Sequence, residues 1–429
     1  MPLHRIAPLA RAAALSTLLL ATTGAARSGE PVWITLGQDA LGLLQRIEPR
    51  TLSVASVAVP VQVPQRSGAS VTQALQGAED TVHLARVDED LLPALSDAVH
   101  ASLKRCGGYI VHASLGEARG HLQSLQATLA RPPAALAADR YAINQQAVVE
   151  PLLAQIQDSH ILSTIETLAA IQNRYYSTSG GATATATIAQ QWQALAAGRS
   201  DVSVRQVNHG YRQQSVVLRI KGRSATKSKQ IVVLGAHMDS ILSGGTGETS
   251  RAPGADDDAS GIASLTEALR VLLASGHRPQ RTIEFMAYAA EEIGLRGSSA
   301  IASSYASAGK KVIGVMQLDM TNYKGGTKDI YLYTDYTNAA QNTFVANLAA
   351  TYLPSLSVGT DRCGYACSDH ASWTSRGFAA SFPFEAPFSG YDPYIHTAND
   401  TLANMGNQTA HAAKFARLAL SYAVELAND

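Results

Sequence analysis

Three adjacent aspartates, Asp256, Asp257 and Asp258, stand in the run APGADDDASG among small residues. Adjacent carboxylates repel one another, and burying them without a partner is costly. One interpretation is a solvated acidic loop that ends in Asp258 as the N-cap of a helix, because helix starts favour aspartate. The other is a loop that holds a multivalent metal ion. The other polar residues of the chain decide between the two.

Further acidic and imidazole side chains follow three apolar runs that read as buried strands. After IVVLGA, TIEFMAYAA and VIGVMQL come, in chain order, His237, Asp239, Glu291, Glu292 and Asp319. Ligands of open α/β sheets bind outside the carboxyl ends of the strands, and the aspartate loop leaves the same edge. These side chains are therefore expected to converge on one crevice, where a cation would offset their charge.

This set is too large for one metal ion and sufficient for two. Carboxylate oxygens together with imidazole suit zinc, and two-metal sites place their ions about 3.5–4 Å apart. One carboxylate then bridges the ions, and another stays off the metals as a base. Glu291 and Glu292 fit this division, because adjacent side chains leave an extended backbone in opposite directions.

A second histidine is expected to complete the site. His396, in the aromatic loop GYDPYIHTAND, is the preferred candidate. His370, in CSDHASW, remains open as a ligand, a neighbour of a ligand or a packing residue. We expect His411 to face solvent from the last helix and His209 to lie in a surface turn.

The elements that must position these residues begin near residue 141. From there, continuous apolar strands alternate with amphipathic helices, which predicts an α/β domain with a mixed, largely parallel central sheet covered by helices on both faces. The expected helices cover about 145–172, 184–197, 259–276 and 407–427. Residues 202–209 and 215–222 alternate like an antiparallel pair of strands.

The residues before this domain read as processing sequence. Residues 1–26 have a basic start, an apolar run and small residues, which is the layout of a secretory signal peptide. The apolar run is far shorter than the roughly 20 residues that span a bilayer. Residues 27–140 resemble a small α/β pro-region with a linker at about 131–140, and a retained accessory domain is the alternative. We expect an exported precursor, extracellular or periplasmic, with no membrane segment after processing and a catalytic domain over 141–429.

Composition agrees with a compact exported protein. Of 429 residues 46% are hydrophobic, and the 34 Lys and Arg balance the 34 Asp and Glu, so the net charge is zero. This balance argues against a nucleic-acid-binding protein and against disorder. Cys363 and Cys367, in CGYAC, have a spacing that suits a tight local disulfide. Cys106 is then left unpaired.

Six motifs carry a family resemblance. GAHMDS, APGADDDASG, FMAYAAEEIGLRGS, QLDMTNYKG, CGYACSDHASW and IHTANDTL follow one another within residues 141–429. Together they resemble the secreted bacterial leucyl aminopeptidases, which are two-zinc exopeptidases in the same broad family as the glutamate-carboxypeptidase-like and transferrin-receptor-like proteins. The resemblance implies the zinc exopeptidase fold.

The resemblance also implies which residues hold the metal. Asp257 would bridge two zinc ions. His237 and Asp319 would hold one ion, and Glu292 and His396 would hold the other.

Roles beyond metal binding follow from the same resemblance. Glu291 would be the general base, and Asp239 would orient His237, as metal-bound histidines require. The peptide bond between Asp257 and Asp258 would be cis. Cys363 and Cys367 match the family's disulfide.

The implied activity is removal of N-terminal amino acids from peptides with a free N-terminus. A water or hydroxide shared by the two zinc ions would attack the first peptide carbonyl, with Glu291 taking its proton and passing it to the leaving amine. An apolar pocket would favour Leu and other large hydrophobic side chains, although Tyr333 and Phe382 narrow it. The implied lining residues are Met320, Tyr333, Tyr365, Phe382, Phe384, Phe388, Tyr391 and Ile395.

Other functions remain as alternatives on the same scaffold. A carboxypeptidase requires an arginine for the substrate carboxylate, and Arg251, Arg296, Arg362 and Arg376 are not obviously placed for one. An aminoacyl-group cyclase is a further possibility. A receptor-like protein without metals is disfavoured because every ligand position is intact, and a one-zinc endopeptidase because no H-E-x-x-H sequence exists. We expect a monomer.

Overall fold

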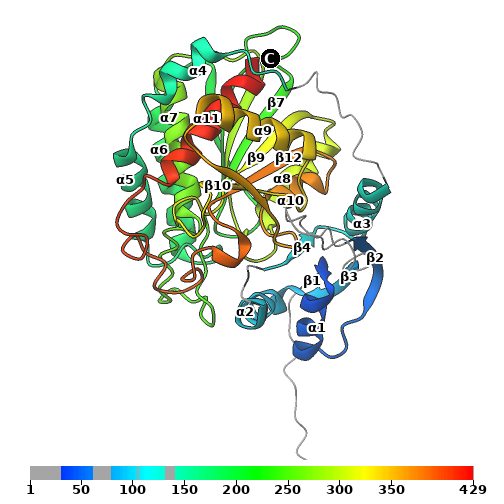
Figure 1. Cartoon of the computed structure of the whole chain (residues 1–429). Coiled ribbons are helices and arrows are strands. Elements are labelled where there is room, and N and C mark those ends of the chain that lie inside the picture. Colours follow the sequence, from blue (N-terminus) through cyan, green and yellow to red (C-terminus); the bar gives the residue numbers. More distant parts are fainter. Residues whose placement is uncertain (1–29, 61–78, 104, 106, 131–140, 429) are drawn as a thin grey trace, which may run out of the picture.

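The computed structural model describes residues 30–60, 79–103, 105, 107–130 and 141–428. The predicted signal peptide and linker, and Cys106, lie outside these residues. The described chain forms two units, one before and one after the linker (Figure 1).

The N-terminal unit is a small α/β unit of the kind expected from its sequence. Its four strands pair antiparallel in the order β2-β3-β1-β4. They are β1 (Pro31–Gly37), β2 (Ser53–Pro60), β3 (Glu79–Asp88) and β4 (Tyr109–His112). The helices are α1 (Gln38–Ile47), the 3-10 turn η1 (Glu89–Leu91), α2 (Leu92–Leu103) and α3 (Leu115–Ala130). Alternate strand residues such as Ile34 and Leu36 are buried against α1 and α2.

The second unit has an eight-stranded sheet in the order β11-β10-β12-β9-β7-β8-β6-β5. The strands are β5 (Val202–Val207), β6 (Ser215–Ile220), β7 (Gln230–His237), β8 (Thr282–Tyr288), β9 (Lys311–Gln317), β10 (Ile330–Tyr333), β11 (Val358–Asp361) and β12 (Ala380–Phe384). Its central strands β8, β7, β9 and β12 are parallel, whereas β5, β6 and β10 join antiparallel neighbours. The predicted mixed, largely parallel sheet is confirmed.

Helices cover both faces of this sheet (Figure 1). They are α4 (Gln146–Leu153), α5 (Asp158–Ala169), α6 (Ser179–Leu195), α7 (Ala259–Ala274), α8 (Arg296–Ser307), α9 (Ala339–Tyr352), α10 (His370–Thr374) and α11 (Ala412–Asn428). Val232 and Leu234 of β7 pack with α7 and α11, while their neighbours Ile231 and Val233 pack with α8 and Trp373 on the opposite face. This two-sided burial explains why the strands read as continuous apolar runs.

Three predicted helix boundaries were wrong. The helix expected over 184–197 begins at Ser179, where the Thr178 side chain caps it by accepting the Gly181 amide at 3.1 Å. The helix expected over 145–172 is two helices, because the chain turns between Leu153 and Asp158. Pro151 has no backbone amide to donate near the end of α4. The Gln157 amide donates to Glu267 of α7 at 2.7 Å instead of bonding within a helix. The last helix begins at Ala412 rather than near residue 407.

The start of the second unit is tied to its last helix. The backbone amides of Asn144 and Gln145 donate to the two carboxylate oxygens of Glu425, at 3.0 and 2.9 Å. Glu425 is fully buried on α11, and the Tyr352 hydroxyl donates to it as well. These bonds hold the two residues just before α4, of which Gln145 is the N-cap.

The two units contact each other through polar pairs. Glu89 lies 2.6 Å from Arg296, and Glu117 lies 3.3 Å from Arg376. The Val111 amide of β4 donates to the Gly294 carbonyl at 3.0 Å.

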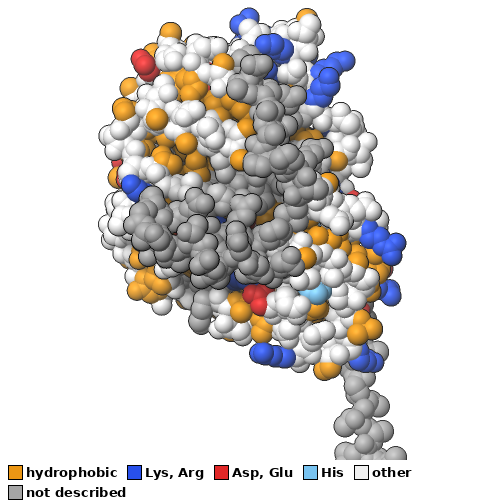
Figure 2. Space-filling view, turned by 45° about the vertical axis from the view of Figure 1, so that its right-hand side comes forward, with side chains coloured by type: hydrophobic (Ala, Val, Ile, Leu, Met, Phe, Trp, Pro, Cys, Tyr) orange, Lys and Arg blue, Asp and Glu red, His pale blue; other side chains and the backbone are white. Residues whose placement is uncertain are grey.

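On the face that Figure 2 shows, lysine and arginine side chains are dispersed rather than gathered into a basic patch.

None of the described helices has the length and apolar character of a membrane-spanning segment.

Candidate active site

The polar residues singled out in the sequence lie at the carboxyl edge of the parallel strands. His237 is the last residue of β7, Glu291 and Glu292 follow β8, and Asp319 follows β9. Asp257 lies in the loop between β7 and α7. Because β7 pairs in parallel with both β8 and β9, these three strand ends are neighbours.

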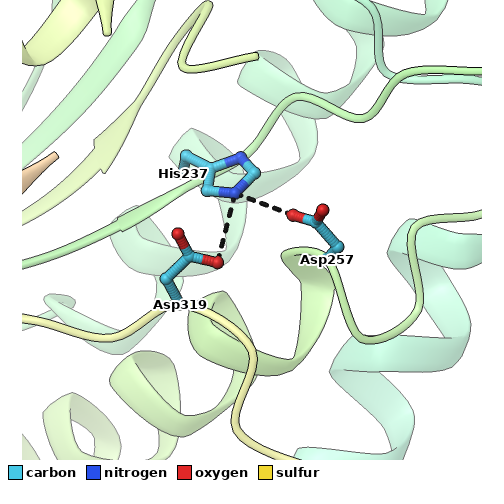
Figure 3. Close-up of side chains that lie close together, drawn as sticks. All are labelled: His237, Asp257 and Asp319. Atoms are coloured by element: carbon cyan, nitrogen blue, oxygen red, sulfur yellow. Dashed lines mark ion pairs between the residues drawn. The ribbon is translucent and has the colours of Figure 1, made fainter. Parts of the chain in front are cut away.

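The five predicted metal ligands form two clusters of buried side chains with one shared member. In the first, His237 Nε2 lies 3.0 Å from Asp257 and 3.5 Å from Asp319 (Figure 3). In the second, His396 Nε2 lies 3.2 Å from the other oxygen of Asp257 and 2.9 Å from Glu292. In each cluster the three ligand atoms lie within 4.8 Å of one another. Asp257 therefore offers one oxygen to each cluster.

The donor set fits zinc. Each cluster offers one imidazole nitrogen and carboxylate oxygens, the usual ligands of catalytic zinc. Oε1 of Glu292 is buried and has no hydrogen-bond donor among the described residues. Burial raises the pKa of the Glu292 carboxyl to about 7, while histidine contacts outweigh the same effect at Asp257 and lower its pKa. Gathering so much carboxylate in a buried site favours a bound cation.

Glu291 is buried beside both clusters and belongs to neither. Burial raises its pKa well above the usual value. Asp239 fixes the loop, because its two oxygens accept the backbone amides of Glu291 and Glu292 at 3.0 and 3.1 Å. The same carboxylate lies 3.4 Å from Nδ1 of His237.

The three aspartates of the opening motif have different roles. All three are buried, so the expected solvated loop was wrong, while the expected N-cap at Asp258 is confirmed. The Asp257–Asp258 peptide bond is cis, as the resemblance implied. Asp258 is the N-cap of α7, because its side chain accepts the Gly261 amide at 2.8 Å. Its other oxygen accepts the His237 amide at 3.0 Å. Asp256 accepts the Asn322 amide at 3.0 Å and ties the loop to the segment after β9.

The sequence did not reveal two residues that support the clusters, one at the Asp257 loop and one at Asp319. Asp400 accepts the backbone amides of Asp256 and Asp257 at 2.8 and 3.1 Å. Ser368 donates to Asp319 at 2.5 Å. Both residues lie in motifs quoted above, IHTANDTL and CGYACSDHASW, but their spacing in the sequence does not show which distant segment they contact.

Arg174 was also missed. Its guanidinium is fully buried and donates to the carbonyls of Met238 and Gly254 at 2.8 Å each, and to those of Leu168 and Pro253. Met238 follows His237, and Pro253 and Gly254 precede the aspartate loop. Arg174 thus joins two of the segments that carry the clusters.

The remaining histidines lie outside both clusters. His370 stacks on Phe382, with ring centres 4.6 Å apart, and its Nε2 lies 3.1 Å from the Asp335 carbonyl, so it is a packing residue. His209 lies partly buried near the turn between β5 and β6. The expectation that His411 faces solvent was wrong. It precedes α11, where it is buried against the Glu385 carbonyl at 3.3 Å.

An aromatic pocket opens beside the first cluster, with Asp319 in its wall. All eight predicted residues line it: Met320, Tyr333, Tyr365, Phe382, Phe384, Phe388, Tyr391 and Ile395. Tyr333 packs against Phe384 and Phe382, with ring centres 4.8 and 5.4 Å apart. The predicted disulfide is present between Cys363 and Cys367, which also line the pocket.

The N-terminal unit lies over this site. Arg105 lines the aromatic pocket, with its guanidinium carbon 4.4 Å from the Tyr365 ring centre. The rings of His100 and His396 are 4.6 Å apart. The Ser96 hydroxyl donates to the carbonyl of Glu292 at 3.0 Å. The segment 96–105 therefore contacts the pocket through Arg105, the second cluster through His100 and the loop after β8 through Ser96.

Comparisons with known proteins find similar peptidases. The model of peptidase family M28 matches residues 215–421. Leucine aminopeptidase 1 of Arthroderma otae is 39% identical over 293 residues, which are 65% of this chain and 76% of that protein. The structure of the LapA aminopeptidase of Legionella pneumophila has a TM-score of 0.73 at 27% identity and covers 94% of this chain and 100% of its own. LapB of the same organism has a TM-score of 0.73 at 29% identity, covering 93% and 100%.

Proposed function

This chain belongs to peptidase family M28 and is a metallo-aminopeptidase, and on that premise we propose that it is a two-zinc leucyl aminopeptidase exported as a precursor. The sharing of Asp257 between two clusters carries this proposal. The five ligands divide as His237 and Asp319 on one ion, Glu292 and His396 on the other, with Asp257 bridging. Two bound zinc ions would supply positive charge that activates a water molecule and polarises the scissile carbonyl.

Glu291 is the general base of this proposal. It lies beside both clusters without joining either, and its backbone is fixed by Asp239. Its carboxylate takes the proton of the attacking water and delivers it to the leaving amine. A group that performs both steps needs a pKa nearer neutrality than that of a free carboxylate, and burial shifts the pKa of Glu291 in that direction.

The aromatic pocket supports a preference for large hydrophobic first residues. Its walls are apolar, and it adjoins Asp319 of the first cluster. A first side chain in this pocket places the following peptide bond near the clusters, as exopeptidase action requires. Leucine fits the chemistry of such walls. The pairing of Tyr333 with Phe382 limits the room for larger side chains.

Residues 27–140 are proposed to be a pro-region that follows a signal peptide over 1–26. The contacts of Ser96, His100 and Arg105 with the site support this role, because a peptide substrate needs the same space. The local disulfide supports export, since disulfides persist in oxidising compartments.

The test compares two substrates on protein processed to begin near residue 141. Leucine anilide and N-acetyl-leucine anilide differ only in the free amine. We expect release of aniline from the first alone, loss of this activity with a chelator, and its recovery with two zinc ions per chain. Cleavage of both substrates would show that the amine is not recognised. Inactivity on both with zinc supplied would favour a cyclase, a carboxypeptidase or a receptor.

A further inference from the structure

A second group of side chains packs against the loop of the general base and has no part in the mechanism above. Tyr175, Tyr176 and Tyr211 pack with Ile241, Ala290 and Ile293, and we call these six residues the tyrosine patch. The three rings meet edge to face, with centres 4.8 and 5.1 Å apart. Because Ala290 and Ile293 flank the two glutamates, the patch includes the loop that carries them.

Arg296 is held at the edge of the tyrosine patch. Its guanidinium carbon lies 5.1 Å from the ring centre of Tyr211 and 5.6 Å from that of Tyr176. Its backbone amide donates to the Ala290 carbonyl at 3.0 Å, which closes the loop around Glu291. Aromatic faces stabilise a cation in this position. The arginine is therefore a fixed positive charge at the end of the loop.

A carboxylate of the N-terminal unit already pairs with the Arg296 guanidinium. Glu89 lies 2.6 Å from Arg296, and it belongs to the turn just before α2. The Ser96 hydroxyl of α2 contacts the Glu292 carbonyl of the same loop. Departure of the N-terminal unit would remove Glu89 and expose the guanidinium beside the catalytic loop.

Two hydroxyl groups of the tyrosine patch are buried without a partner. The hydroxyl oxygens of Tyr175 and Tyr211 have no hydrogen-bond partner among the described residues. Buried polar groups are normally paired. Tyr211 lies close enough to Arg296 and Asp239 for both charges to affect its pKa, which burial raises first of all. Arg296 at the edge of the tyrosine patch and the Tyr211 hydroxyl beside it thus offer a guanidinium and a hydroxyl donor, and these are groups that bind a carboxylate.

We propose that Arg296, with the hydroxyl of Tyr211, binds a substrate carboxylate on the leaving side of the scissile bond. This inference rests on the proposed aminopeptidase function. The aromatic pocket beside Asp319 takes the first side chain, so the rest of the peptide must lie along another wall of the site. Arg296 lies at the end of the loop that carries Glu291 and Glu292. The carboxylate is either the acidic side chain of the second residue or the terminal carboxylate of a dipeptide.

The experiment measures ratios of kcat/KM on the form of the protein that hydrolyses leucine anilide. Leu-Glu-amide against Leu-Gln-amide tests the acidic side chain, and Leu-Gln against Leu-Gln-amide tests the terminal carboxylate. We expect a preference of about tenfold for the carboxylate in one of these pairs, equivalent to one charge-assisted hydrogen-bonded contact. Each ratio is independent of the fraction of active enzyme, so partial misfolding of a variant does not affect it.

The variants separate the Arg296 site from general effects of losing an arginine. Arg296→Gln should bring the ratio close to one, and Tyr211→Phe should lower it partly. Arg376→Gln is the matched control, since Arg376 also pairs with a carboxylate of the N-terminal unit but lies outside the tyrosine patch, and it should keep the preference. A wild-type ratio near one in both pairs, or a preference that survives Arg296→Gln, would overturn the inference alone. A protein inactive on leucine anilide in every form would overturn the proposed function and this inference with it.

Discussion

Glu291 and Glu292 are neighbours in the chain whose side chains have different surroundings. Glu292 lies 2.9 Å from His396 in the second cluster, whereas Glu291 belongs to neither cluster. The predicted reason for this division was wrong, because the backbone here is not extended: Ala290 has a positive φ of 56°, and the Gly294 and Leu295 amides donate to the Glu291 carbonyl at 3.0 and 2.9 Å. A turn therefore separates the two side chains, and no alternation in the sequence reveals it. The partner of the loop, Asp239, sits 52 residues earlier, and its hydrogen bonds to both amides depend on the pairing of β7 with β8.

Replacement of Glu291 by glutamine tests the division of roles. We expect kcat for leucine anilide to fall by at least about 100-fold, because the amide cannot accept the proton of the attacking water. Zinc content should remain two per chain, since Glu291 belongs to neither cluster. Asp257→Asn is the matched control and should reduce zinc content, because Asp257 belongs to both. Loss of zinc from the Glu291 variant, measured by atomic absorption, would contradict the assignment.

At the scale of elements, strands were easier to predict than the segments that join them. Strands β7, β8 and β9 are buried on both faces, so their apolar runs identify them, and the proposed metal ligands follow directly at their ends. The aspartate loop is held by Arg174 and Asp400, which lie about 80 residues before it and 143 residues after it in the chain. Such contacts arise only from the tertiary fold. The turn that separates α4 from α5 was missed for the same reason, because Glu267 of α7 holds it.

Arg174→Met should destabilise the segments that carry Asp257 and His237. The substitution keeps much of the side-chain length but leaves the carbonyls of Met238, Gly254, Leu168 and Pro253 without their donor in a buried place. We expect the free energy of unfolding to fall by about 3 kcal/mol or more and the affinity for zinc to fall with it. Urea unfolding and competition with a chelator measure the two effects.

The control is Arg212→Met, at an exposed arginine that pairs with Glu248 on the surface. This variant should change neither unfolding nor zinc affinity appreciably. Equal effects of the two substitutions would mean that the buried bonds of Arg174 contribute nothing particular to the site.

At the scale of the whole molecule, the position of one unit on the other could not be predicted from the sequence. Composition and periodicity predicted two units and the fold of each. Their contact depends on single residues such as Glu89, Ser96 and Arg105, which belong to no motif. Further contacts between the units surround a pair of buried histidines, His112 on β4 and His121 on α3, with ring centres 5.4 Å apart.

The surroundings of these two histidines favour the neutral rings. His112 contacts the Thr35 hydroxyl at 2.8 Å, and His121 stacks near Tyr336 of the second unit. Burial, reinforced by the nearby Arg376, lowers the pKa of His121 to about 3, and burial lowers that of His112 well below its usual value. Both rings therefore stay neutral in the folded protein at pH values where the unfolded chain is protonated.

Stability of the full chain should consequently fall as the pH drops below about 6.5. The unfolded state binds a proton at each histidine there and the folded state does not, so each should cost about 1.4 kcal/mol at pH 5.5 relative to pH 7.5. Urea unfolding at the two pH values, with and without the substitutions His112→Asn and His121→Leu, isolates this contribution. Contributions of His237 and His396 are common to both proteins and cancel. An identical pH dependence in the two proteins would show that the pair is not responsible.

The bonds from Glu425 to the amides of Asn144 and Gln145 have one more consequence. They bring the first helix of the catalytic unit and its last helix together, so the two ends of this unit are neighbours in space. A circular permutant that joins residue 428 to residue 141 through a short linker, and opens the chain at an exposed loop such as the one around Gly244, would keep every strand pairing of the eight-stranded sheet. The order of the segments along the chain can thus change while the fold that positions the five proposed metal ligands stays the same.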